Sequence, residues 1–91
     1  MPEVKHCYII CLDFGEDTEI APIIAKVKGY GTWARITNNT WAVVTAETAT
    51  QIREVFSSLL KSDDRIFVVR SGTASAWRNA RCKNEWLREH L

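Results

Sequence analysis

The 91-residue sequence contains no apolar run that approaches the roughly 20 residues of a membrane-spanning helix. The segment before the first apolar run, residues 1–5, is short and of mixed polarity, so no secretory signal peptide is expected. Internal repeats and low-complexity tracts are also missing. These absences predict one domain over residues 1–91, located in the cytoplasm and without membrane contact.

Cysteine is scarce, and Cys7, Cys11 and Cys82 are its only positions. Three is an odd number, and their spacing is not that of a metal-ligand set. Cys7 and Cys11 would lie about 13 Å apart on a strand, which is too far for a disulfide. A reduced chain is therefore the better interpretation, and this also favours the cytoplasm.

Net charge is small, at +1, but it is unevenly distributed. Residues 1–64 carry six Lys or Arg against nine Asp or Glu, whereas residues 65–91 carry six against two. A net charge near zero argues neither for nor against an anionic partner. The local excess places any basic surface in the last strand and the C-terminal tail.

The stretch Cys7–Phe14 contains seven apolar residues in eight and predicts a strand that is buried on both faces. Because strand side chains alternate, Tyr8, Ile10 and Leu12 share one face, while Asp13 follows the other face to the end of the strand. A strand of this kind needs cover on both sides. A buried carboxylate must pair, bind a cation or reach water.

The rest of the sequence predicts three more strands and up to three helices. We expect strands at 32–37, 40–45 and 65–70 and helices from about 18 to 28 and from about 49 to 60, with a weaker helix after Ser75. Asp17 or Thr18 is expected to cap the first helix and Gly29 and Gly31 to end it in a left-handed conformation. Asn38-Asn39 predicts a two-residue hairpin, because Asn tolerates positive φ.

This order is β-α-β-β-α-β, which predicts a ferredoxin-like α+β sandwich with two helices on one face of a four-stranded antiparallel sheet. Thr48, with Gln51 three residues on, predicts a capping box for the second helix. The first and third strands should be central. The other face would expose apolar surface, so we expect the tail, residues 73–91, or a second protomer to cover it.

The sequence resembles the SinR-like proteins, a prokaryotic and phage group related in fold to the small CRISPR-associated adaptation subunit and to VapD-type ribonucleases. The resemblance covers roughly residues 7–79 and includes Tyr8–Asp13, Tyr30–Trp33, Asn39–Val43, Asp63–Val69 and Ala74–Trp77. It implies a homodimer formed through the sheets, with Asp13 paired across the two-fold axis. It also implies a metal-dependent nuclease activity, although Leu12 stands where the family has Tyr before this Asp.

Asp13 has two interpretations. Two copies meeting at a dyad would offer oxygen donors suited to Mg²⁺, which could activate water for phosphodiester hydrolysis. Alternatively, an Asp at the end of a strand starts a turn or caps a helix. The pair Asp63-Asp64 is most simply a turn, and His6 and His90 belong to no recognisable triad.

The basic residues of the last third of the chain, interleaved with tryptophan, suggest contact with a nucleic-acid backbone. The predicted nucleic-acid-binding residues are Arg65, Arg70, Arg78, Arg81, Lys83, Arg88 and Trp77. The opposing interpretation is an ordinary charged surface, with Trp33, Trp41 and Trp77 as core or interface anchors. Our leading hypothesis is a homodimeric binding or assembly module for nucleic acid or a protein partner; the alternative is the Asp13-dependent nuclease.

Overall fold

The computed structural model describes residues 4–72 and 74–91 and has the predicted element order. Its elements are β1 (His6–Asp13), α1 (Ile20–Lys28), β2 (Trp33–Thr37), β3 (Thr40–Thr45), α2 (Ala49–Ser57), β4 (Arg65–Arg70) and α3 (Asn84–His90). The sheet order is β2-β3-β1-β4, with every neighbouring pair antiparallel. The ferredoxin-like α+β arrangement with β1 and β3 central is therefore confirmed.

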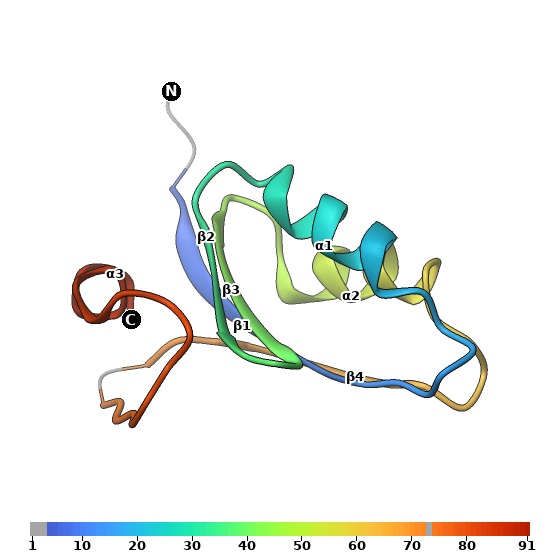
Figure 1. Ribbon diagram of the computed structural model, residues 1–91. Coiled ribbons are helices and arrows are strands. Elements are labelled where there is room, and N and C mark those ends of the chain that lie inside the picture. The colour runs from blue at the N-terminus through green and yellow to red at the C-terminus, as the bar shows by residue number, and fades with distance from the viewer. Residues whose placement is uncertain (1–3, 73) are drawn as a thin grey trace.

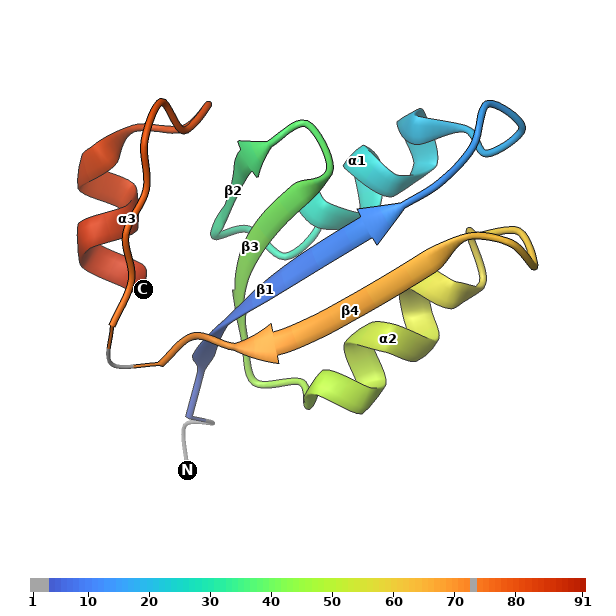
Figure 2. The same ribbon diagram turned by 90° about the horizontal axis from the view of Figure 1, so that it is seen from below.

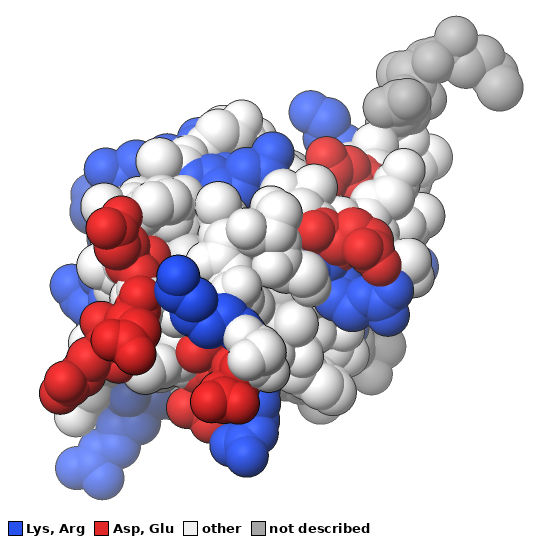
Figure 3. Space-filling view, turned by 90° about the vertical axis from the view of Figure 1, so that its right-hand side faces the viewer, with Lys and Arg blue, Asp and Glu red and all other residues white. Residues whose placement is uncertain are grey.

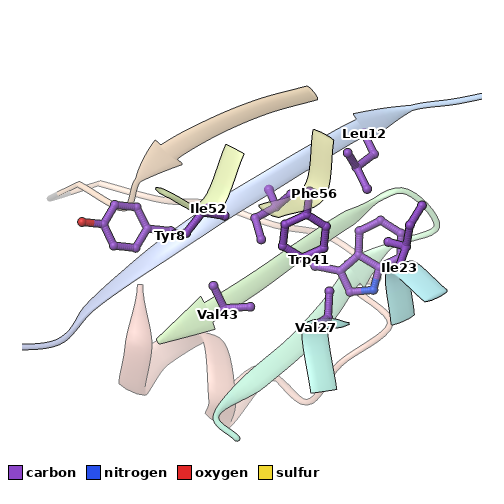
Figure 4. Close-up of a cluster of buried hydrophobic side chains, with 9 residues drawn as sticks. Tyr8, Leu12, Ile23, Val27, Trp41, Val43, Ile52 and Phe56 are labelled. Carbon is purple, nitrogen blue, oxygen red and sulfur yellow. The ribbon is translucent and has the colours of Figure 1, made fainter. Parts of the chain in front are cut away.

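Helices α1 and α2 cover one face of this sheet (Figure 1). The core between the two layers takes Tyr8, Ile10 and Leu12 from β1 and Trp41 and Val43 from β3. The helices contribute Ile23 and Val27 from α1 and Ile52 and Phe56 from α2, and Figure 4 shows these side chains converging with those of the strands. Alternation along the strands thus places the bulky residues of the central strands beneath the helices.

Helix α2 begins as predicted. Gln51 N–H donates to Thr48 Oγ1 over 3.1 Å, and the Gln51 side chain accepts from Thr48 N–H at 2.8 Å. This capping box satisfies two amides that a helix start would otherwise leave unpaired. The stripe of α2 then buries Ile52 and Phe56, while Tyr30, which follows α1, stacks on Phe56 with ring centroids 6.4 Å apart.

The ends of α1 differ from the prediction. The N-cap is Glu19, without a side-chain cap bond, because the Thr18 hydroxyl donates to Asp64 on another loop instead. At the other end Gly29 is still right-handed (φ −63°), and Gly31 alone takes positive φ, at 85°. The bond from Thr18 to Asp64 on a distant loop therefore replaces the expected side-chain cap of α1.

The hairpin at Asn38-Asn39 is confirmed by the pairing of Thr37 with Thr40, but its expected basis was wrong. Neither Asn has positive φ; among the non-glycine residues that the structure describes, only Asn79 does, at 55°. A register shift between Arg35 and Thr37 accommodates the turn instead.

The tail also differs from the prediction. No helix begins at Ser75: residues 74–83 are irregular, and α3 begins at Asn84 after the N-cap Lys83. Trp77 and Ala80 lie before the helix starts, and Leu87 is the buried residue of α3. The tail therefore consists of an irregular segment followed by a short helix, and Leu87 on that helix is its buried residue.

This tail covers part of the second face of the sheet. Helix α3 lies beside β2, on the opposite side of the sheet from α1 and α2 (Figures 1 and 2). Ala34 and Ala42 face each other across β2 and β3 on that second face and are buried, although α1 and α2 cannot reach them. The Arg81 amide, which donates to the carbonyl of Ile36 over 2.9 Å, brings the tail to the β2 edge of this face.

Candidate functional site

A groove of about 510 Å³ runs along the free edge of β2, between α1 and the tail. Its lining combines cations with indole rings. The cations are Lys28, Arg35, Arg81 and Lys83; the indoles are Trp33, Trp41 and Trp86. We call this site the β2-edge groove. Two of the predicted nucleic-acid-binding residues, Arg81 and Lys83, lie in it.

Arg35 is held in the groove by two contacts. Its guanidinium lies over the indole of Trp41, with Cζ 5.2 Å from the ring centroid. Its Nε and Nη2 donate to the backbone oxygen of Asn38 over 3.1 and 2.7 Å. Because β2 is an edge strand, the guanidinium reaches the groove even though its stem starts on the helix-covered face.

Arg81 is brought to the same place by the tail. Its backbone N–H donates to the carbonyl of Ile36 over 2.9 Å, which extends the pairing of the β2 edge by one bond. Its Nη1 donates to the side-chain oxygen of Asn38 over 3.0 Å. One turn residue, Asn38, thus holds two guanidinium groups, through its backbone and its side chain.

The groove has no compensating negative charge. Its lining contains no Asp or Glu, and among residues 4–72 and 74–91 none of its four cations has a carboxylate within 4.0 Å. Burial, and then the neighbouring charge of Arg81, lower the pKa of Arg35. Two like charges held together without a counterion make the groove an anion-attracting site.

The structure separates the other predicted nucleic-acid-binding residues from this groove. Arg65 and Arg70 lie at the two ends of β4, Arg78 on the irregular tail and Arg88 on α3, and all four are exposed. Trp77 donates its Nε1–H to Asn84 Oδ1 over 3.0 Å and so braces the start of α3. None of these five residues lines the groove.

Asp13 lies at a different end of the molecule, in a hollow formed by the β1–α1 and α2–β4 loops. The side chain is 68% exposed, and its Oδ2 accepts from Arg65 Nη1 over 2.9 Å. The hollow is also lined by Glu16, Asp17, Asp63 and Asp64, and Figure 3 shows carboxylates gathered on this side. Its excess of negative charge is the opposite of what a phosphate needs.

The carboxylates around Asp13 in one subunit are the candidate ligands for Mg²⁺. Across the residues that the structure describes, no three His, Cys, Asp or Glu side chains come together as a metal site. Asp13 is engaged by Arg65, and Asp64 accepts from Lys61 N–H (2.7 Å), Gly15 N–H (3.2 Å) and the Thr18 hydroxyl. The residues of one subunit therefore do not fit a Mg²⁺ ligand set, and the carboxylate of Asp64 serves to join two loops.

This loop junction gives a testable pH dependence. The bond from Thr18, and then those from the Lys61 and Gly15 amides, lower the pKa of Asp64. A carboxyl with a lowered folded-state pKa stabilises the fold above its unfolded pKa of about 4, and this contribution disappears as the pH falls through the folded value. Asp64→Asn should therefore melt at a lower temperature than the wild type at pH 7, and the difference should shrink steadily below about pH 4.

Asp63→Asn is the matched control, because it changes the neighbouring carboxylate of the same exposed loop. Its melting temperature should follow that of the wild type across the same pH range. A constant difference between wild type and Asp64→Asn from pH 7 to pH 2 would contradict the assigned role of the carboxylate.

The sequence identified only half of the β2-edge groove. Lys28, Arg35 and Trp33 come from the acidic part of the chain, where Lys28 looks like a solvated helix residue and the Trp33–Arg35 alternation looks like core. The available signal was that β2 is an edge strand with a Trp and an Arg on one face. Nothing in the sequence indicates that the tail returns to this edge.

A second surface feature lies on the second face of the sheet, under β1 and β4. Phe67 and Val69 are 62% and 42% exposed, and they pair across the ladder with the half-buried Cys11 and Ile9. We call these four residues the β1–β4 apolar strip. The tail lies beside β2, whereas β4 is at the opposite edge of the sheet (Figure 2).

No helix in the described part of the chain is long and apolar enough to cross a membrane. Comparisons with protein-family models, with curated proteins and with solved structures found no match. The resemblance to the SinR-like proteins therefore stays a prediction from the sequence, and the function must be argued from the β2-edge groove and the β1–β4 apolar strip.

Proposed function

We propose that the protein is a non-enzymatic binding module whose β2-edge groove contacts nucleic acid. The observation that carries this proposal is a groove lined by four cations and three indoles with no carboxylate among them. Cations supply the sequence-independent attraction to phosphates, and indole faces accept bases by stacking. The basic, Trp-containing tail predicted to make this contact contributes Arg81, Lys83 and Trp86.

Nucleic acid fits this groove better than an acidic protein partner does. Carboxylates of a peptide could neutralise the cations, but they leave the indoles without a planar partner. A nucleotide presents a phosphate and a flat ring within one unit, which matches both components of the lining. Binding of acidic peptide in place of oligonucleotide would overturn this choice.

Arg81 and Arg88 provide the matched test, because both are exposed arginines of the tail and only Arg81 lines the groove. Affinity of the wild type for a short single-stranded oligonucleotide should fall with salt with a slope of about −3, as expected if its four cations each displace a counterion. Arg81→Ala should weaken binding several-fold and reduce the magnitude of that slope by about 0.7. Arg88→Ala should change neither quantity.

Fluorescence anisotropy titrations at several salt concentrations measure both values. Equal effects of Arg81→Ala and Arg88→Ala would mean that charge acts diffusely and that the groove is not the contact. An affinity independent of salt would reject the proposed phosphate contacts altogether.

We further propose that two copies associate through the β1–β4 apolar strip. Exposed apolar side chains on neighbouring strands of one sheet face commonly mark an interface. A two-fold axis places each strip against its counterpart and buries both, as the resemblance to the SinR-like proteins implies. A monomer at tens of micromolar in sedimentation would contradict this association without affecting the groove.

The Asp13-dependent nuclease stays the alternative. Asp13 borders the β1–β4 apolar strip, so association there would bring two copies of Asp13 nearer each other. Cleavage of labelled RNA or DNA in Mg²⁺ that is lost in Asp13→Asn would favour the enzyme. Binding without cleavage, unchanged in Asp13→Asn, would favour the module. A cytoplasmic location belongs to the same proposal and agrees with the three free cysteines.

A further inference from the structure

We infer that the β2-edge groove takes a single strand of nucleic acid, with one phosphate held between Arg35 and Arg81 and an unpaired base against the groove's indoles. This rests on the proposed function and adds which form of nucleic acid binds and how. The two guanidiniums are the phosphate clamp, and Trp33 and Trp86 are the stacking wall.

The phosphate clamp is organised before any ligand arrives. Arg35 is held on the indole of Trp41 and on the Asn38 carbonyl, so its orientation is fixed from two sides. Arg81 is held by its backbone bond to Ile36 and its side-chain bond to Asn38 Oδ1. Groups that are already in place lose less conformational freedom when they bind.

Neither guanidinium of the phosphate clamp has a carboxylate within 4.0 Å among the residues that the structure describes. Asn38 supplies only neutral oxygens to Arg35 and Arg81, and burial, followed by the neighbouring charge of Arg81, lowers the pKa of Arg35. A phosphate between the two guanidiniums would neutralise their repulsion and accept charge-assisted hydrogen bonds. Of the groove's other cations, Lys28 lies over one face of the Trp33 ring, with Nζ 5.8 Å from the ring centroid.

The stacking wall favours an unpaired base. Trp33 and Trp86 are half-buried and line the groove. Lys28 lies over one face of Trp33, and the His90 ring packs on Trp86 with centroids 4.4 Å apart, so an incoming base would stack on the remaining exposed part of each ring. In a duplex the bases are stacked on one another inside the helix, and only phosphates reach a protein surface of this kind. A single strand can turn a base into a hollow of about 510 Å³, which is within the usual range for ligand pockets.

The other exposed cations agree with a local site for a single strand. Arg65 is at the opposite, acidic end beside Asp13, and Arg70, Arg78 and Arg88 lie on three different segments outside the groove. Double-stranded nucleic acid is usually met by a continuous basic face. The described surface instead brings four cations without a carboxylate partner together around one hollow that contains aromatic rings.

The first measurement compares three probes by anisotropy and competition: a fluorescein-labelled oligothymidylate, a duplex of the same length, and inorganic polyphosphate of matched charge. Stacking of a single base contributes roughly 5- to 160-fold in affinity, so the oligothymidylate should bind at least about tenfold more tightly than the other two probes. Equal affinity for duplex or for polyphosphate overturns the single-strand inference while leaving nucleic-acid or anion binding in place. Absence of binding to both the oligonucleotide and the duplex overturns the proposed function itself.

The second measurement tests the clamp through Asn38, which acts here as a positioning residue. Asn38→Ala removes the side-chain acceptor of Arg81 but keeps the carbonyl that holds Arg35 and leaves the charge unchanged. It should weaken oligothymidylate binding about fivefold. Asn39→Ala, the adjacent residue of the same turn, should stay within twofold of the wild type.

A double-mutant cycle separates positioning from a general structural effect. If Asn38 acts through Arg81, Asn38→Ala should have no further effect in an Arg81→Ala background. Additive losses in the double variant, or equal losses in Asn38→Ala and Asn39→Ala, would overturn the clamp. Thermal melting of each variant confirms that the comparison is made on folded protein.

Discussion

Replacing Leu87 with alanine should detach the C-terminal tail from the sheet and reduce oligonucleotide affinity at least tenfold. Leu87 is 1% exposed, and burial losses of this kind cost about 2–5 kcal/mol for a Leu→Ala change. The tail supplies Arg81, Lys83 and Trp86 to the β2-edge groove. A detached tail therefore removes half of the cations and one indole from the site.

The loss should be local, because Leu87 does not belong to the main core cluster beneath α1 and α2. Hydrogen exchange should accelerate at the Arg81 amide, which donates to Ile36, while amides of β1 and β3 keep their protection. Ile52→Val is the matched control: it removes one methyl group from the main core, costs about 0.5–1.5 kcal/mol in unfolding free energy and should leave affinity unchanged. An Leu87→Ala variant with wild-type affinity would mean that the docked tail does not form the site.

Phe67→Asp should convert the protein from a dimer to a monomer at micromolar concentration. Phe67 is the most exposed residue of the β1–β4 apolar strip, and facing its counterpart across a two-fold axis would place two carboxylates in an apolar interface. We expect the dimer dissociation constant to rise more than 100-fold, since a buried unpaired charge costs several kcal/mol. Because the side chain is 62% exposed in one subunit, the fold should be retained.

Val4→Asp is the matched control for that variant. Val4 is 72% exposed and apolar but lies outside the β1–β4 apolar strip, so its replacement should leave the dimer intact. Analytical ultracentrifugation over a concentration series distinguishes the two. Equal dissociation in both variants would indicate non-specific association, and a wild-type monomer would remove the dimer from the account.

The fold could be predicted because its determinants are local. The apolar run of β1, the capping box at Thr48 and the apolar stripe of α2 each specify an element from adjacent residues, and their order leaves few topologies. The cap of α1 could not be predicted, since Thr18 bonds Asp64, 46 residues away in sequence. Local signals do not reveal such a partner.

The β2-edge groove could be predicted only in part for the same reason. The basic bias of residues 65–91 pointed to Arg81 and Lys83, which do line it. The same basic bias pointed equally to Arg65, but the pairing of β1 with β4 places Arg65 beside Asp13, among the carboxylates of the loop hollow. Arg35 entered the site only because the irregular tail, with Asn79 at positive φ, returns to the β2 edge.

Indole resonances provide the most direct test of the β2-edge groove as the nucleic-acid contact. In a ¹⁵N–¹H spectrum of the whole protein, titration with oligothymidylate should shift the Nε1–H signals of Trp33 and Trp86, which line the groove. The Trp77 signal should stay in place, because its Nε1–H is bonded to Asn84 outside the groove. Shifts confined to Trp77 or to the loops around Asp13, with Trp33 and Trp86 unmoved at saturation, would contradict the account.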